Sequence, residues 1–243
     1  MNIIKLDAIG STNTYLKDLL TVSNLENFTV VVAENQFAGK GQRGSTWTSE
    51  AGSSLSFSVL MKDILSSPEY VFDLNVMVAL SVYQALKKTY NLPFYIKWPN
   101  DILSYNKKIC GILIENIIKA NGETQSIVGI GINVNQESFN DFPQASSLFK
   151  LTGTKTDKDV LLNAVLDELK YYSEQYLAKG GDFLWIEYHS HLYRINTPTA
   201  FENKEHTRFM GIIKEVTKYG LIRIQLEDDS IQEFGMKEIK MLY

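Results

Sequence analysis

The 243-residue sequence predicts an α+β fold, in which helices flank a mixed β-sheet and a small β-barrel follows. Three observations lead to this prediction. Apolar residues recur at helical spacing over residues 70–90 and 157–177, and shorter apolar or alternating runs elsewhere have strand periodicity. Near residue 196 the pattern changes to short alternating segments. We therefore expect a larger first domain over residues 1–194 and a small second domain over residues 195–243.

The first domain should begin with a strand and a helix, because an apolar run at residues 2–6 precedes Ser11 and Thr12, either of which can cap a helix. The helix at residues 70–90 should lie in the core, since apolar residues recur along it every three or four positions. The other elements are expected as strands at 28–33, 55–61, 94–98, 109–118 and 126–134, turns at 106–107 and 121–122, and helices at 157–177 and 183–192.

The second domain should consist of about five short strands. Alternating segments at residues 208–216, 221–226 and 231–234 are separated by turn residues at 218–220 and 228–229. So many short strands in so short a stretch favour a small barrel-like module.

Composition excludes several classes of protein. A net charge of −4 and a pI of about 5.5 provide no general attraction to nucleic acid, so we expect no specific DNA binding. The single cysteine, Cys110, excludes an intramolecular disulfide and fits a reducing cytoplasm. The sequence has neither a secretory leader nor an apolar run of about eighteen residues, so we expect a cytoplasmic protein without a membrane segment.

A glycine-rich loop at residues 39–44 is the strongest single indication of function. It combines three glycines with Lys40 and Arg43, and Trp47 follows closely. Such a loop can wrap around a phosphate while an indole stacks on a base, but a hairpin tip with solvated charges has the same composition. The glycines match the G-x-G-x-x-G spacing, yet strand periodicity follows at residues 53–61 where a dinucleotide site needs a helix.

Four motifs occur in order along the chain: STN at residues 11–13, the glycine-rich loop at 39–44, KWPND at 97–101 followed by KKICGILIE at 107–115, and GIGINVN at 129–135. Together they closely resemble the biotin protein ligases, which adenylate biotin and attach it to a lysine of a carboxylase carrier domain. The resemblance runs essentially from end to end. It implies a biotin–lipoate ligase fold, similar to class II synthetases, with an SH3-like C-terminal domain.

Many bacterial relatives begin with a helix-turn-helix domain, whereas this sequence starts directly at the ligase body. We therefore expect a short form of the enzyme without a repressor role. The resemblance implies ATP, Mg²⁺ and biotin as the small molecules used, and the biotin carboxyl carrier domain of a biotin-dependent carboxylase, such as acetyl-CoA carboxylase, as the partner. Either a monomer or a homodimer is compatible with the sequence.

By this resemblance, Lys108, Asp101 and Arg43 are the catalytic residues. Lys108 would bridge the biotin carboxylate and the α-phosphate, and Asp101 would accept the proton of the attacking carrier lysine. Without the resemblance, Lys108 would be taken as a solvated turn lysine and Asp101 as the first residue of an Asx turn.

The resemblance also implies two sets of binding residues. Those for biotin are Ser11, Thr12, Asn13, Gln36, Gly39, Lys40, Gly41, Gln42, Lys108, Gly111, Gly129 and Gly131. Those for ATP and the adenylate are Lys40, Gln42, Arg43, Trp47, Asn100, Lys108 and Asn133, with Trp47 stacked on adenine. No residue is expected to ligate a metal, because the H-x-H at 189–191 has no partner at ligand spacing.

The loop departs from the commonest family pattern, which has arginines where this sequence has Lys40, Gln42 and Ser45. Its closure over the intermediate should therefore be weaker. Two other functions stay open at this point. One is a lipoate or octanoate ligase of the same fold, and the other is a non-catalytic biotin sensor.

Overall fold

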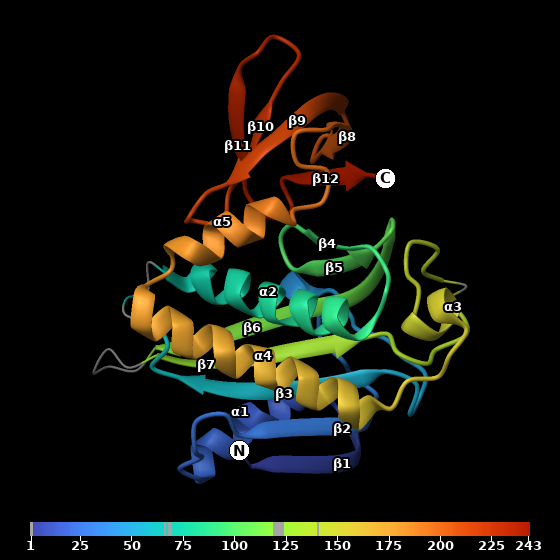
Figure 1. The fold of residues 1–243 in the computed structure, drawn as a ribbon, viewed down its shortest axis with the longest axis vertical. Coiled ribbons are helices and arrows are strands. Elements are labelled where there is room, and N and C mark those ends of the chain that lie inside the picture. The colour runs from blue at the N-terminus through green and yellow to red at the C-terminus, as the bar shows by residue number, and fades with distance from the viewer. Residues whose placement is uncertain (1, 66, 68–69, 119–123, 140) are drawn as a thin grey trace.

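The computed structural model describes residues 2–65, 67, 70–118, 124–139 and 141–243, apart from the side chain of Arg43 (Figure 1). It contains a seven-stranded sheet with helices on both faces and a separate five-stranded sheet at the C-terminal end. The predicted α+β class with a mixed sheet is confirmed.

The larger sheet is mixed. Its order is β1-β2-β3-β7-β6-β5-β4, in which β1 and β2 are parallel and all other neighbours are antiparallel. The strands are β1 Ile3–Ile9, β2 Val30–Gln36, β3 Leu55–Lys62, β4 Phe94–Lys97, β5 Asp101–Ser104, β6 Lys107–Ile118 and β7 Thr124–Ile132.

One face of this sheet forms the main core. Strand alternation places Phe57, Ile112 and Ile130 on this face, and all three are almost completely buried. The long helix α2 (Val71–Thr89) packs on this side, and α4 (Lys158–Lys179) and α5 (Asp182–Ser190) pack against α2 (Figure 1). The helices predicted at residues 70–90, 157–177 and 183–192 are therefore present.

The opposite face is only partly covered. Helix α1 (Thr12–Val22) packs Leu16 on a small cluster that contains Val31, Leu60 and Ile127. Farther along β6 and β7, this face carries glycine where the core face carries isoleucine. Because glycine fills no space, the uncovered part of the sheet becomes the floor of a cavity.

The C-terminal sheet has five antiparallel strands in the order β11-β10-β9-β8-β12. They are β8 Pro198–Asn203, β9 Arg208–Val216, β10 Ile222–Gln225, β11 Ile231–Phe234 and β12 Ile239–Leu242. Several hydrogen bonds join it to the larger body. Among them, the Trp98 indole N–H donates to the carbonyl of Gly220 at 3.0 Å, and His189 Nε2 pairs with the main chain of Val216 at 3.0 Å. The second sheet is thus fixed beside the KWPND segment.

Three elements differ from the prediction. Strand β5 and the short helix α3 (Leu148–Thr152) were not expected from the sequence, because both are too short for a period to be recognised. The turn expected at 106–107 lies at 105–106, since Lys107 already pairs with Ser104 in the β5–β6 ladder. The turn expected at 121–122 lies outside the described residues.

No helix of the described chain is both long and apolar enough to cross a membrane.

The packing of α1 leads to a stability prediction. Leu16→Ala should lower the free energy of unfolding by about 2–5 kcal/mol, because it leaves a cavity at a completely buried position. Val22→Ala in the same helix should change it by less than about 0.5 kcal/mol, since Val22 is 76% exposed. Urea unfolding followed by circular dichroism measures both, and equal losses for the two variants would contradict the assignment of the buried face.

Candidate functional site

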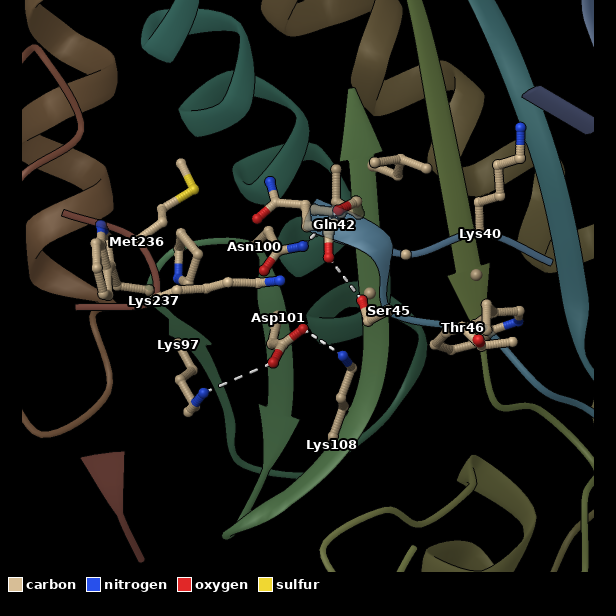
Figure 2. Close-up of a pocket in the computed structure, with 18 of the residues that line it drawn as sticks. Lys40, Gln42, Ser45, Thr46, Lys97, Asn100, Asp101, Lys108, Met236 and Lys237 are labelled. Carbon is tan, nitrogen blue, oxygen red and sulfur yellow. Dashed lines mark hydrogen bonds and ion pairs between the residues drawn. The ribbon is translucent and has the colours of Figure 1, made fainter. Parts of the chain in front are cut away.

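A cavity of about 530 Å³ lies between the glycine-bearing face of the larger sheet and the edge of the C-terminal sheet. Figure 2 shows residues of the glycine-rich loop, β4 to β6 and the segment before β12 around it. Its wall includes most of the residues expected from the sequence, namely Ser11, Thr12, Asn13, Gln36, Lys40, Gly41, Gln42, Trp47, Asn100, Asp101, Lys108, Gly111, Gly129 and Gly131. Four separate parts of the sequence therefore meet in one place.

The floor of the cavity is a row of residues that cross the sheet. Register pairs Asp101 with Gly111, Gly111 with Gly131, and Gly131 with Ser56. The Trp47 indole lies directly on this row, because a Cβ atom on Gly131 would come within 2.4 Å of the Trp47 ring. A Cβ atom on Gly111 would approach both the indole and the Lys108 side chain to 3.2–3.3 Å. The close approach of the indole thus requires glycine at position 131, whereas a side chain at position 111 would push the indole or the Lys108 side chain aside by a few tenths of an ångström.

The glycine-rich loop is closed by its own main chain. Lys40 and Thr46 form an antiparallel bridge, the Gly41 N–H donates to the Ser45 carbonyl at 2.7 Å, and the Trp47 N–H donates to the Gly39 carbonyl at 3.0 Å. A 3₁₀ turn spans Gln42–Gly44 at the tip. The hairpin interpretation of the loop is thus right for its backbone, and the same geometry brings Trp47 to the cavity floor.

One expected residue of this loop lies outside the cavity wall. Gly39 lies at the base of the hairpin rather than in the cavity wall, and a Cβ atom there would come within 2.4 Å of the Trp47 carbonyl. It therefore permits the closure of the loop. The side chain of Arg43 lies outside the described residues.

One end of the cavity is polar. The side-chain oxygen of Gln36 accepts from the Thr12 N–H at 2.8 Å, and the Thr12 hydroxyl lies 2.7 Å from the hydroxyl of Ser58. Ser58 in turn donates to Asn13 Oδ1 at 2.5 Å, and Asn13 donates to Glu115 at 2.9 Å. Ser11 occupies the N-cap position of α1 without a side-chain cap bond. Side chains from α1, β2, β3 and β6 thus form one connected group of donors and acceptors.

Glycine also makes this polar end possible. A Cβ atom on Gly129 would come within 2.3 Å of Asn13 Oδ1, so any side chain there would displace the amide. Ser58 was not expected from the sequence as part of the site. It was predicted only as a strand residue, although its alternation with apolar Phe57 and Val59 indicates that it faces the other side of the sheet.

The opposite end of the cavity carries charge. The Asp101 carboxylate lies 2.6 Å from the Lys108 ammonium and 3.7 Å from the Lys97 ammonium, as Figure 2 shows. The Lys108 side chain also lies over the Trp47 ring, 6.0 Å from its centroid. Burial lowers the pKa of Lys97 below its usual value, and Asp101 opposes this effect. At this end, two lysines paired with one carboxylate therefore face a cavity floored by glycine.

Lys108 owes its direction to a bulge in the sheet. The β5–β6 register shifts next to Ile102, and the Lys108 main chain bonds to residues 144 and 146 on its other side, with its N–H donating to the Gln144 carbonyl at 2.8 Å. Asn133 reinforces this arrangement, because its amide donates to the carbonyls of Ser146 at 3.1 Å and Lys108 at 3.5 Å. Asn133 is buried and lies outside the cavity wall.

Asn100 and the residues around it are held by main-chain contacts. The Asn100 amide donates to the Ile112 carbonyl at 2.6 Å, and Asn75 of α2 donates to the Pro99 carbonyl at 2.6 Å. Asp101 begins β5 rather than an Asx turn. The KWPND segment is therefore a short, well-anchored link between β4 and β5, which positions Lys97 and Asp101 opposite each other.

Lys97 is one of the charged residues in the cavity wall that the sequence-based site lacked, and the C-terminal segment adds Glu202, Lys204, Lys237, Glu238 and Lys240. The motif itself contains Lys97, but its role as a partner of Asp101 depends on their pairing across β4 and β5. Among the described residues, no group of three or more His, Cys, Asp or Glu side chains is placed to hold a metal ion.

Comparisons with known proteins place these features in a family. The family model described as "Biotin/lipoate A/B protein ligase family" matches residues 6–135. The bifunctional ligase/repressor BirA of Bacillus spizizenii is 31% identical over 98% of this chain and 72% of its own length. The biotin–[acetyl-CoA-carboxylase] ligase of Mycobacterium tuberculosis is 26% identical over 89% of this chain and 81% of its own.

Solved structures agree with the sequence comparisons. The biotin protein ligase from Aquifex aeolicus in complex with biotin and ATP superposes with a TM-score of 0.82 at 27% identity and covers 99% of this chain and 98% of its own. This chain spans between 54 and 72% of the length of four BirA relatives. Because the family model covers more than half of the chain and the first relative is 31% identical, the protein belongs to the biotin/lipoate A/B protein ligase family.

Proposed function

We propose that this protein is an ATP-dependent biotin protein ligase, which activates biotin as biotinyl-5′-AMP and transfers the biotinyl group to a lysine of a carrier protein. The observation that carries the proposal is the cavity itself. It joins a polar end suited to a ring amide, a glycine floor beneath an indole, and a charged end with two lysines. The similarity to an enzyme solved with biotin and ATP supports the same function.

The polar end suits the ureido ring of biotin. That ring has one carbonyl and two N–H groups, which need matched partners when they are buried. Thr12, Gln36 and Asn13 line this end and offer both donors and acceptors, and the buried Ser58 connects Thr12 with Asn13 behind them. The dithiolane ring of lipoate has no such groups, so this end of the cavity favours biotin over lipoate.

In the first half-reaction, an oxygen of the biotin carboxylate attacks the α-phosphorus of ATP, and the bond to the pyrophosphate breaks. Two anions must approach each other, so positive charge is needed between them. Lys108 supplies it, because its ammonium faces the cavity next to Gly111, where the absence of a side chain leaves room. Mg²⁺ would arrive bound to the phosphates of ATP, in keeping with its preference for phosphate and water oxygens, and would neutralise the departing pyrophosphate.

Trp47 provides the adenine platform. Its indole lies so close to Gly131 that a Cβ atom there would clash with the ring, and the loop that carries it is closed by main-chain bonds. A base stacked on such a fixed ring is held without the loss of side-chain freedom. Lys40, Gln42 and Ser45 line the same side of the cavity and would contact the phosphates.

In the second half-reaction, the amine of the carrier lysine attacks the mixed anhydride and AMP leaves. The attacking amine must be neutral, although a lysine has an ordinary pKa of about 10.4, so a nearby base is required. Asp101 lies in the cavity wall beside Lys108 and can orient the incoming ammonium and accept its proton. The carrier is proposed to be the biotin carboxyl carrier domain of a carboxylase such as acetyl-CoA carboxylase.

Detection of biotinyl-5′-AMP tests the proposal directly. The protein is incubated with ATP, Mg²⁺ and biotin, and the product is identified by mass spectrometry, with lipoate or octanoate in place of biotin as the comparison. The proposal expects biotinyl-5′-AMP and little or no lipoyl or octanoyl adenylate. Preferential activation of lipoate or octanoate would assign the chain to the other branch of its family, and no adenylate from any acid would indicate a non-catalytic sensor.

Lys108→Met should reduce adenylate formation by at least about 10²-fold, because it removes the charge that joins the two anions. Lys107→Met is the matched control, since the neighbouring Lys107 side chain is directed to the Pro143 carbonyl. Biotin-dependent exchange of pyrophosphate into ATP measures the first half-reaction alone. Near wild-type exchange in Lys108→Met would rule out the proposed role.

Asp101→Asn should separate the two half-reactions. The variant should still form biotinyl-5′-AMP, but the rate of transfer to the carrier domain should fall by about 10²-fold or more, the usual contribution of a positioned general base. Transfer of preformed, radiolabelled biotinyl-5′-AMP in a single turnover measures the second step without the first. A wild-type transfer rate would show that Asp101 is not the base.

A further inference from the structure

In the described part of the chain, the Asp101 carboxylate forms ion pairs with two lysines, whose side chains differ in how exposed they are. Lys108 lies 2.6 Å from one carboxylate oxygen and its side chain is 34% exposed, whereas Lys97 lies 3.7 Å from the other oxygen and its side chain is 16% exposed. Asp101 itself is only 13% exposed. The nearer partner is thus the one with more freedom to leave.

The proposed first half-reaction requires Lys108 to leave. Its ammonium must turn from Asp101 toward the biotin carboxylate and the α-phosphate, which are stronger anionic partners. An isolated, largely buried carboxylate is unfavourable and tends to take up a proton. A protonated Asp101 cannot accept a proton from the carrier lysine in the second step. The site therefore needs a cation that stays on Asp101 when Lys108 moves.

Lys97 is placed to be that cation. Its backbone faces Asp101 directly across the β4–β5 pair. The link between them is anchored on three sides, by Asn75 at Pro99, by Trp98 at Gly220 and by Asn100 at Ile112. The ring of Tyr243 lies beside the Lys97 ammonium, with its centroid 5.3 Å away.

We propose that Lys97 is the resident counter-ion of Asp101: a positioning residue that keeps this carboxylate ionised and directed into the cavity while Lys108 is engaged with biotin and ATP. This inference rests on the proposed ligase function. It assigns the two lysines of the charged end to different tasks. Lys108 moves between partners, and Lys97 stays.

The charges around Lys97 set the expected pH dependence. It faces Asp101 on β5, Lys108 on β6, and Lys240 and Tyr243 of the C-terminal segment. Tyr243 is neutral, because burial raises its pKa to about 12. When Lys97 is removed, Asp101 loses a nearby cation that favours its charged form. The transfer rate, which needs ionised Asp101, should then fall at a higher pH than in the wild type.

Single-turnover transfer of preformed biotinyl-5′-AMP to a carrier domain, measured across pH, tests the inference. Lys97→Met should move the acid limb of the pH profile up by about one pH unit, which slows transfer about 10-fold at a pH below that limb. Lys97→Arg should restore the wild-type limb, because it retains the positive charge. Lys88→Met removes a surface lysine that pairs with Glu168 and should leave rate and profile unchanged.

A purely structural role for Lys97 predicts a different result. Lys97→Met would then lower the melting temperature and slow both half-reactions without a shift of the acid limb, and this outcome would overturn the inference. A folded Lys97→Arg variant that does not restore the wild-type acid limb would also overturn it. If Lys97→Met does not fold, Lys97→Gln is used in the same assay, and it too should slow transfer and move the acid limb to higher pH. A wild-type protein that forms no biotinyl-5′-AMP and labels no carrier would instead contradict the proposed function itself.

Discussion

The charged end of the cavity depends on Asp101. Among the described ion pairs at this end, its carboxylate is the only anion that lies between the ammonium groups of Lys97 and Lys108. Without it, two lysines would repel each other across a largely buried space. With it, both can face the cavity, and the net charge of the three groups is positive where the anions of the reaction must meet. The position of Asp101 in turn depends on the anchored link between β4 and β5.

The glycine row is the second constraint. Asp101, Gly111 and Gly131 lie side by side across three strands, so the charged group and the platform for Trp47 share one line on the sheet. The same strands carry isoleucines on their other face, where they pack under α2. The alternation of isoleucine and glycine along these strands thus fills the core on one face of the sheet and leaves space for the cavity on the other. It also explains why a hairpin loop far away in sequence can lay an indole on the sheet.

Much of this arrangement was predictable from the sequence. The long helices, most strands of the larger sheet and the five-stranded module follow from the spacing of apolar residues, which reports the burial of one face. Strand β5 was missed because four residues that begin with a charged side chain show no period. Its pairing with β4 and β6, the strands directly before and after it in the sequence, defines it instead.

The sequence predicted which residues form the site better than it predicted the contacts among them. The motifs collected Lys108, Asp101, Trp47 and the glycines, yet they did not show that Lys97 pairs with Asp101, which depends on strand register. Nor did they show that Ser58 joins Thr12 to Asn13, which depends on how α1 packs on β3. Asn133 matched a motif, but its amide contacts the main chain behind Lys108, which a linear sequence cannot reveal. The binding roles of the individual residues stay predictions.

The intact mass of a biotin carboxyl carrier domain, measured after incubation with this protein, ATP, Mg²⁺ and biotin, tests the central claim most directly. The account predicts a gain equal to one biotinyl group on a single lysine, and no gain when ATP or biotin is omitted. A carrier domain that an established biotin ligase labels in parallel, but that keeps its original mass with this protein, would contradict the account.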